Sequence, residues 1–291
     1  MTQNFIVINN NIPNKDSIND FLLSKKLENK SPLTIERYKN FLVNFFKSVP
    51  QNIKDLTKDD ILNWLEQYSK NRKEGTIITK FSILSVYLKY CYEEGYINNN
   101  IISNRWKPKA PKPLPKYLER SEVDRIRIES EKGNIRDQAL LEFLVSSGCR
   151  VKEAFNLNIG DVDLSNRTVK VIGKGDKFRF VHISEYCAVL FEKYLECHSK
   201  KNTAFFIGKS NNRLGIRRIQ IIIRKLGMGA GLKKSISPHC LRHTFATSLL
   251  SKGADIEFIQ DELGHSELGT TRIYARLPQQ NIIDLYNKFM R

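Results

Sequence analysis

The sequence is poor in the features that mark secreted, zinc-ribbon and membrane-spanning proteins. Its five cysteines are odd in number, scattered and without a CxxC pair, which argues against a disulfide framework and suits reduced thiols. The longest apolar runs are short, such as Ile221–Ile223, so no stretch approaches the length needed to cross a membrane. The N-terminus also lacks the basic and apolar regions of a signal peptide. We therefore expect a globular protein in the cytoplasm.

Acidic residues are scarce relative to basic ones. The 291 residues include 48 lysines and arginines against 31 aspartates and glutamates, a formal net charge of +17. Residues 1–105 hold only 15 of the basic and 11 of the acidic side chains, so most of the excess falls after residue 105. Such a charge indicates a polyanionic partner, with nucleic acid the leading candidate. A charge excess that only serves solubility has the same signature.

A basic, proline-rich stretch divides the chain. The segment RWKPKAPKPLPKY at 105–117 has four prolines, five basic residues and no acidic one. Proline at this density prevents a helix and favours an extended connector. We predict a linker over 106–116 that joins an N-terminal domain, 13–105, to a C-terminal domain, 117–291.

The spacing of apolar residues predicts mainly helices. In the N-terminal domain, helical periodicity predicts an all-α bundle over 17–27, 32–46, 57–68 and 75–95. In the C-terminal domain, RTVKVIGKGDKFRFVHIS at 167–184 changes to the period of strands, which predicts a β-hairpin with Lys174 at its tip. Helices are expected before this hairpin and, after it, near 185–199, 213–226, 239–252, 255–262 and 279–290. The fold class predicted is mainly α with a small antiparallel β-sheet, in two domains.

The stretch SPHCLRHTFA at 237–246 holds the first candidate site residues. His239 and His243 are four residues apart and share one face of the expected helix, as zinc ligands do. Arg242 lies on the same face, however, and a guanidinium beside a divalent cation is unfavourable. Ser237 suits the N-cap, and a helix N-terminus favours an anion. We therefore favour a phosphate site, with no metal and no cofactor, over a zinc site.

Three further stretches complete this constellation. SSGCRVKEAFNL contains Arg150 and Glu153, three residues apart, GKG contains Lys174, and LGHSELGTTRIYARL contains His265 and Tyr274. The motifs R-x-x-E, hairpin lysine, H-x-L-R-H, L-G-H and T-T-x-x-Y occur in this order. In these motifs and their spacing the chain resembles the tyrosine recombinases, also called the phage-integrase or Xer-like family. The resemblance covers almost the whole chain, including the all-α N-terminal domain and the linker.

The resemblance implies a DNA strand-transfer reaction. Tyr274 is expected to attack a DNA phosphodiester, which leaves a 3′-phosphotyrosyl bond and a free 5′-hydroxyl. Arg150 and Arg242 are expected to bind the non-bridging oxygens, where charge develops in the transition state. Lys174 is expected to protonate the leaving 5′-oxygen. Tyr274 and Lys174 also have ordinary alternatives, a buried or surface tyrosine and a solvated lysine at a hairpin tip, respectively.

The remaining site residues have supporting roles in this scheme. His239 is expected to accept the proton of Tyr274, and His265 to donate a hydrogen bond to the phosphate. Glu153 is expected to orient His239 or Arg150. For His243, its apolar neighbours favour packing and a structural hydrogen bond instead.

The resemblance also suggests how DNA is bound. Arg37 and Lys80 lie at the start of the two helices that resemble the family's groove-facing pair, and Arg217 and Arg218 lie on a basic amphipathic helix at 212–227. A solvated helix face is the alternative for each of them. The partner expected is double-stranded DNA with inverted-repeat core sites, on which phosphate contacts position the protein and base contacts specify the sequence.

The C-terminal helix at 279–290 has an apolar stripe that the resemblance assigns to a neighbouring protomer. This implies a homotetramer on two DNA sites, or a heterotetramer with a related recombinase, with or without an accessory protein, acting at the nucleoid. Packing of the helix on its own domain is the alternative, because a sequence pattern does not separate the two.

The competing functions are a type IB topoisomerase and a DNA-binding protein that descends from a recombinase but does not cleave.

Overall fold

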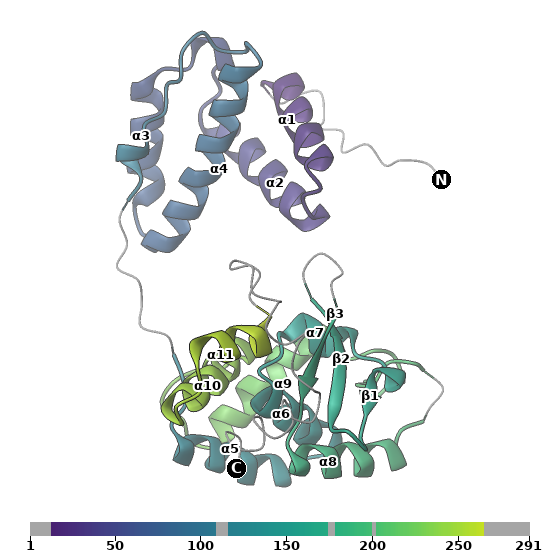
Figure 1. Ribbon diagram of the computed structural model, residues 1–291. Helices are drawn as coiled ribbons and strands as arrows, with labels where there is room; N and C mark the ends of the chain where they lie inside the picture. Colours follow the sequence, from purple (N-terminus) through teal and green to yellow (C-terminus); the bar gives the residue numbers. More distant parts are fainter. Residues whose placement is uncertain (1–12, 109–115, 174–177, 200–201, 265–291) are drawn as a thin grey trace. The chain divides into compact units, whose positions relative to one another are not determined.

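The computed structural model describes residues 13–108, 116–173, 178–199 and 202–264. The chain divides into two compact units, Met1–Pro113 and Leu114–Arg291, and the division falls within the proline-rich stretch (Figure 1). The described ranges are mainly helical with a three-stranded antiparallel sheet, which confirms the fold class predicted from the sequence. None of the helices in these ranges is both long and apolar enough to span a membrane.

The N-terminal unit is a bundle of helices whose ends follow from local sequence signals. Its elements are α1 Lys15–Leu27, α2 Pro32–Ser48, η1 Ile53–Asp55, α3 Lys58–Ser69, α4 Glu74–Glu93 and η2 Asn104–Trp106. Thr57 and Asp60 form a capping box at the start of α3. Gly95 follows α4 with φ 76°, a left-handed conformation that ends a helix at little steric cost when the residue is glycine. The buried core is rich in aromatic residues: Phe21, Phe45, Phe46, Phe81 and Tyr87.

The C-terminal unit combines helices with the sheet. Its elements are α5 Arg120–Glu131, α6 Ile135–Ser147, α7 Val151–Asn156, η3 Ile159–Asp161, β1 Val162–Asp163, β2 Thr168–Ile172, β3 Phe178–His182, α8 Glu185–Glu196, α9 Ile216–Gly229, α10 Pro238–Ser251 and α11 Ile256–Leu263. The β2–β3 pairing runs from Thr168 opposite His182 to Ile172 opposite Phe178. This register confirms the predicted hairpin. Strand β1 is only two residues long, too short for the period of strands to reveal it in the sequence.

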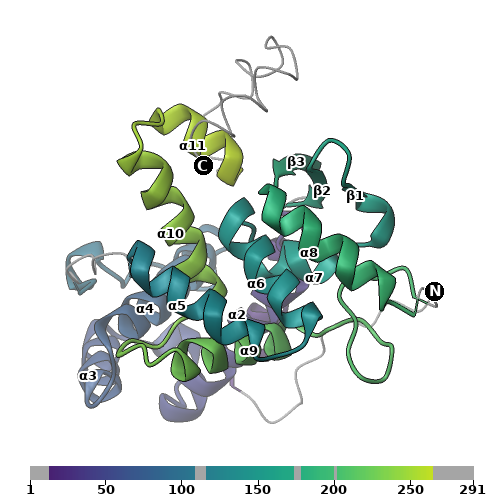
Figure 2. The same ribbon diagram turned by 90° about the horizontal axis from the view of Figure 1, so that it is seen from below.

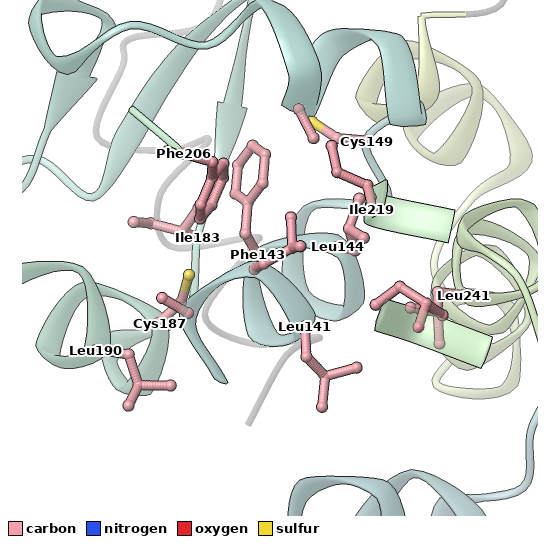
Figure 3. Close-up of a cluster of buried hydrophobic side chains, with 14 of the residues drawn as sticks. Leu141, Phe143, Leu144, Cys149, Ile183, Cys187, Leu190, Phe206, Ile219 and Leu241 are labelled. Carbon is pink, nitrogen blue, oxygen red and sulfur yellow. The ribbon is translucent and has the colours of Figure 1, made fainter. Parts of the chain in front are cut away.

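Helix α6 lies at the centre of this unit, beside α5, α8 and α10 (Figure 2). Its side chains Leu141, Phe143 and Leu144 are fully buried or nearly so. They meet apolar residues from the helices and strands around them, among them Cys149, Ile183, Cys187, Leu190, Phe206, Ile219 and Leu241 (Figure 3). Burial of this many side chains holds α6 and the turn that follows it in a fixed position.

The basic helix α9 starts later than the sequence suggests. The pattern predicts a helix from about residue 212, but α9 begins at Ile216 with Gly215 as its N-cap. Arg213 therefore precedes the helix, and its guanidinium donates to the carbonyl oxygens of Phe155 and Leu157. Its role is to tie this loop to the end of α7, so its predicted place on the basic helix is wrong.

Candidate active site

A sharp turn after α6 places Arg150. Gly148 caps α6 in the left-handed conformation (φ 60°), and a Cβ at this position would lie 2.5 Å from Cδ1 of Phe245. Only glycine fits this close approach without displacement of the phenylalanine. Arg150 then becomes the N-cap of α7, which turns its backbone N–H and its side chain toward Glu153 in the first turn.

Glu153 is the centre of an ion cluster. Its carboxylate is almost fully buried and accepts from the backbone N–H of Arg150 (2.8 Å), from Arg150 Nη1 (2.9 Å) and from Arg179 Nη1 and Nη2 (2.9 and 3.2 Å). Burial alone would raise the pKa of Glu153, but the charge of Arg179 and the hydrogen bonds from both arginines hold it below its ordinary value. The R-x-x-E spacing thus produces a carboxylate that fixes Arg150, as one of the two predictions for Glu153 states.

Arg242 is a buried cation without a carboxylate in direct contact among the described residues. Its guanidinium is 6% exposed and donates to the carbonyl oxygens of Gly148 (2.8 Å) and Leu263 (2.6 Å). Burial, together with the positive charge of Arg150, lowers the pKa of Arg242 to about 10. An anion that reaches the remaining N–H groups of such a cation stabilises it strongly through charge-assisted hydrogen bonds.

The carboxyl end of α11 gathers three arginines. The carbonyl oxygens of Glu262, Leu263 and Gly264 accept from Arg179 Nε (3.2 Å), Arg242 Nη2 (2.6 Å) and Arg150 Nη2 (3.1 Å), respectively. These carbonyl groups have no helical partner and carry the negative end of the helix dipole, so they suit cationic donors.

Helix α10, which holds Arg242, also holds the two predicted histidines. Helix α10 begins at Pro238 with Ser237 as its N-cap, as the sequence predicts, and places His239 in the first turn. The Nε2 atoms of His239 and His243 are 3.0 Å apart, in hydrogen-bond contact. Burial, followed by the charges of His239 and Arg242, lowers the pKa of His243. His243 therefore makes a hydrogen bond, as predicted, and its partner is the other histidine of the motif.

Lys174, His265, Tyr274 and the C-terminal helix predicted at 279–290 lie outside the described residues. The segments next to them are described. Lys174 belongs to the connection between β2 and β3, and His265 follows Gly264 at the end of α11. The described part of the predicted site is therefore Arg150, Glu153, His239 and Arg242, and the structure adds Arg179 to the cluster around Glu153.

Comparison with known proteins identifies the family. The model of the phage integrase family matches residues 116–281. The tyrosine recombinase XerC of Thermodesulfovibrio yellowstonii is 34% identical over 293 residues, which cover 93% of this chain and 95% of the relative. The chain belongs to the phage integrase family. It is a site-specific tyrosine recombinase, an enzyme that cleaves and rejoins DNA, as its sequence motifs predict.

Solved recombinase structures agree with this assignment. The crystal structure of the XerA recombinase matches with a TM-score of 0.51 and 29% identity, over 94% of this chain and 97% of that one. The lambda integrase tetramer bound to a Holliday junction shares the fold, with a TM-score of 0.73 and 17% identity over 88% of this chain and 79% of that one. A relaxing topoisomerase and a non-cleaving descendant are not favoured.

The residues predicted to bind DNA lie on accessible surfaces of this recombinase. Arg37 on α2 is exposed, and Lys80 on α4 is half-buried with its ammonium group 5.2 Å from the centre of the Phe41 ring. Arg217 and Arg218 are exposed on α9, opposite the buried isoleucines of that helix. Arg218 also lines a pocket of about 340 Å³ whose other cations are Arg136, Lys209 and Arg213, and none of the described residues that line it is acidic.

Sequence reasoning missed Arg179, which links β3 to α7 and α11. The sequence gives no clear signal for it, because Phe178 and Phe180 alternate with Arg179 and would be expected on the buried face, whereas the structure exposes both. Alternation then puts Arg179 on the inner face of the sheet, where an arginine requires an anionic partner. The identity of that partner, Glu153, depends on tertiary structure.

Proposed function

We propose that Tyr274 attacks the scissile phosphodiester in a site-specific recombination reaction. The tyrosine oxygen forms a bond to phosphorus and the bond to the 5′-oxygen breaks, which yields the 3′-phosphotyrosyl intermediate. His239 accepts the proton of Tyr274, and Lys174 gives a proton to the 5′-oxygen as it leaves. The reverse attack by the 5′-hydroxyl of another strand rejoins the DNA and produces a Holliday junction.

The convergence of Arg150 and Arg242 at the carboxyl end of α11 supports this proposal most directly. That end leads within one residue to His265 and within ten to Tyr274. Each guanidinium has five N–H donors, and the contacts to Glu153, Gly148 and the α11 carbonyls leave some of them for non-bridging phosphate oxygens. A phosphate would also compensate the charge of Arg242, the buried cation that lacks a carboxylate partner among the described residues.

We propose that the substrate is duplex DNA with inverted-repeat core sites, at the nucleoid in the cytoplasm. The N-terminal unit would bind the core site through Arg37 and Lys80, and the C-terminal unit through Arg217 and Arg218. Four protomers would assemble on two sites, either as a homotetramer or with a related recombinase, with the C-terminal helix at 279–290 exchanged between neighbours. The support is the tetrameric assembly of lambda integrase on its junction and the net charge of +17.

A trapping assay with wild-type protein tests the chemistry. A core site is first selected by binding from a random duplex library, and a nick is then placed next to the scissile phosphate so that the released oligonucleotide diffuses away. We expect a denaturant-resistant adduct that retains a label on the 5′ side of the break, with unchanged yield in EDTA. Bond energy is conserved in the phosphotyrosine, so no metal or nucleotide is required. An adduct that needs Mg²⁺, or no adduct on any selected site, would contradict the proposal.

The salt dependence of DNA binding tests the assignment of Arg217 and Arg218. Each lost phosphate contact should reduce the slope of log K against log salt by about 0.9. We therefore expect Arg217→Gln and Arg218→Gln each to weaken binding and flatten this slope in a fluorescence anisotropy titration. Arg125→Gln, which removes an equally exposed charge from α5, is the control. A slope that stays unchanged in both α9 variants would show that Arg217 and Arg218 do not contact DNA phosphates.

A further inference from the structure

A buried contact between β3 and α11 has no role in the chemistry proposed above. His182, the last residue of β3, lies with Nδ1 3.0 Å from Glu262 Oε1 near the end of α11. The two side chains are only 8% and 7% exposed. The second carboxyl oxygen of Glu262, Oε2, is buried without a hydrogen-bond partner in the part of the chain that the structure describes.

This contact joins the two segments that lead to the proposed acid and the proposed nucleophile. Strand β3 follows the hairpin connection that contains Lys174, and α11 ends at the residues that precede His265 and Tyr274. A second link reinforces the first, because Arg179 Nε on the same strand donates to the main-chain oxygen of Glu262 (3.2 Å). The strand is thus fastened to the helix by one main-chain and one side-chain contact.

Stability alone is a poor explanation for this arrangement. A buried carboxyl group with one unpartnered oxygen costs free energy, and two apolar side chains of similar volume would fill the same space without that cost. A hydrogen bond differs from an apolar contact in that it fixes the distance and direction between the groups that it joins. The contact is therefore suited to setting a position.

We propose that the His182–Glu262 contact is a positioning latch that sets the hairpin with Lys174 relative to the segment with Tyr274. The inference rests on the proposed function, in which the nucleophile and the leaving oxygen lie on opposite sides of phosphorus. A proton donor misplaced by about 1 Å can cost about 100-fold in rate. His182 and Glu262 touch neither the phosphate nor the reacting oxygens in this scheme and act through the hairpin.

Loss of the latch should loosen the attachment of β3 to α11, because only the Arg179 contact then remains, and should leave α11 in place. The helix is held independently by Arg242 and Arg150, which bind its terminal carbonyls, and by apolar packing of Phe258 and Ile259. Strand β3, in contrast, reaches α11 through His182 and Arg179 alone among the hydrogen bonds found in the described ranges. The defect of a latch variant should therefore resemble the loss of the proton donor.

A pair of DNA substrates separates this defect from simple destabilisation. One substrate has the normal 5′-oxygen at the scissile phosphate and the other has a 5′-bridging sulfur, whose thiolate leaves without a proton because its pKa is far below that of an alcohol. We expect Glu262→Leu to lower the rate of adduct formation about 100-fold on the oxygen substrate. On the sulfur substrate, the same variant should lower the rate by no more than about tenfold. Glu262→Gln, which keeps an acceptor for His182, should stay within a few fold of wild type.

The matched control is Glu122→Leu. Glu122 is also a helix carboxylate with a cationic partner, Lys234 Nζ at 2.7 Å, and its hydrogen-bond partners, Lys234 and the backbone N–H of Glu119, belong to neither strand of the hairpin. Its removal should slow both substrates alike, in proportion to any loss of folded protein. If Glu262→Leu behaves like this control, or loses no activity on the oxygen substrate, the latch is disproved.

Two further measurements separate failure of the latch from failure of the proposed function. Lys174→Ala should be rescued by the sulfur substrate; without that rescue, the role proposed for Lys174 is wrong. Hydrogen exchange then decides the latch independently. In Glu262→Leu, amides of 168–172 and 178–182 should exchange faster while those of 256–263 stay protected. Unchanged exchange in the hairpin would overturn the proposal.

Discussion

Tyr274→Phe should abolish the covalent protein–DNA adduct and leave DNA binding unchanged. The substitution removes only the hydroxyl group, so the packing and charge of the protein are preserved while the attacking oxygen is lost. Removal of a covalent nucleophile lowers the rate of an enzyme on the order of 10⁶-fold, which places residual adduct formation below detection. Denaturing electrophoresis on the nicked core-site duplex measures the adduct, and fluorescence anisotropy measures binding.

Tyr186→Phe is the control for this experiment. Tyr186 is one of the ten other tyrosines and is 44% exposed on α8, so its hydroxyl is available to solvent. It should form the adduct at the wild-type rate. If Tyr274→Phe still becomes joined to DNA, the nucleophile is another residue, and peptide mapping of the adduct would identify it.

The local features of the fold and site were predictable because they depend on residues close in sequence. The N-cap residues Thr57 and Ser237 satisfy backbone N–H groups within their own first turn, so the starts of α3 and α10 can be read directly. The same holds for Arg150 and Glu153, whose spacing of three residues forms a capping arrangement at the start of α7. Alternation of apolar and polar residues likewise identified the valines of the hairpin, whose placement on the buried face sets the strand register.

The parts that were not predictable depend on contacts distant in sequence. Arg179 meets Glu153 across 26 residues and the Glu262 main chain across 83, and no local pattern specifies either contact. The pairing of His182 with Glu262 spans 80 residues. Arg213 was assigned to a helix because basic and apolar residues continue the helical period upstream of Gly215. In the structure, the contacts of Arg213 to α7 hold these residues in a loop, so the helix begins later than the pattern predicts.

The arginines also differ from the simple expectation of two free cations facing a phosphate. Arg150 and Arg242 are already bound to the end of α11 through Gly264 and Leu263. In the proposed mechanism their geometry is preorganised by the same helix that leads to Tyr274, so an oxygen of the phosphate would meet donors that need little reorganisation. It follows that groups which hold these arginines should affect catalysis even without touching DNA.

Glu153 should have the largest effect of this kind. Glu153→Ala leaves Arg150 and the mostly buried Arg179 without their carboxylate, and removal of one partner from a buried ion pair typically costs about 3–5 kcal/mol in the free energy of unfolding. Among molecules that remain folded, loss of the Glu153 contact that positions Arg150 should lower the rate of adduct formation on the order of 100-fold. Urea unfolding and the nicked-duplex assay measure the two effects separately.

The pH dependence of unfolding distinguishes the charge of Glu153 from its packing. Its pKa in the folded state lies below the ordinary value of 4.5, so above that value the carboxylate contributes its full stabilisation. Between 4.5 and the lowered pKa, the unfolded state binds more protons than the folded state, and the stabilisation is lost as the pH falls through this window.

Glu153→Gln has the same shape but no charge. The difference in unfolding free energy between wild type and Glu153→Gln should therefore be large at pH 7 and shrink below pH 4.5. A difference that is equal at both pH values would show that Glu153 stabilises the protein by shape and neutral hydrogen bonds, and the electrostatic account of the arginine cluster would be wrong.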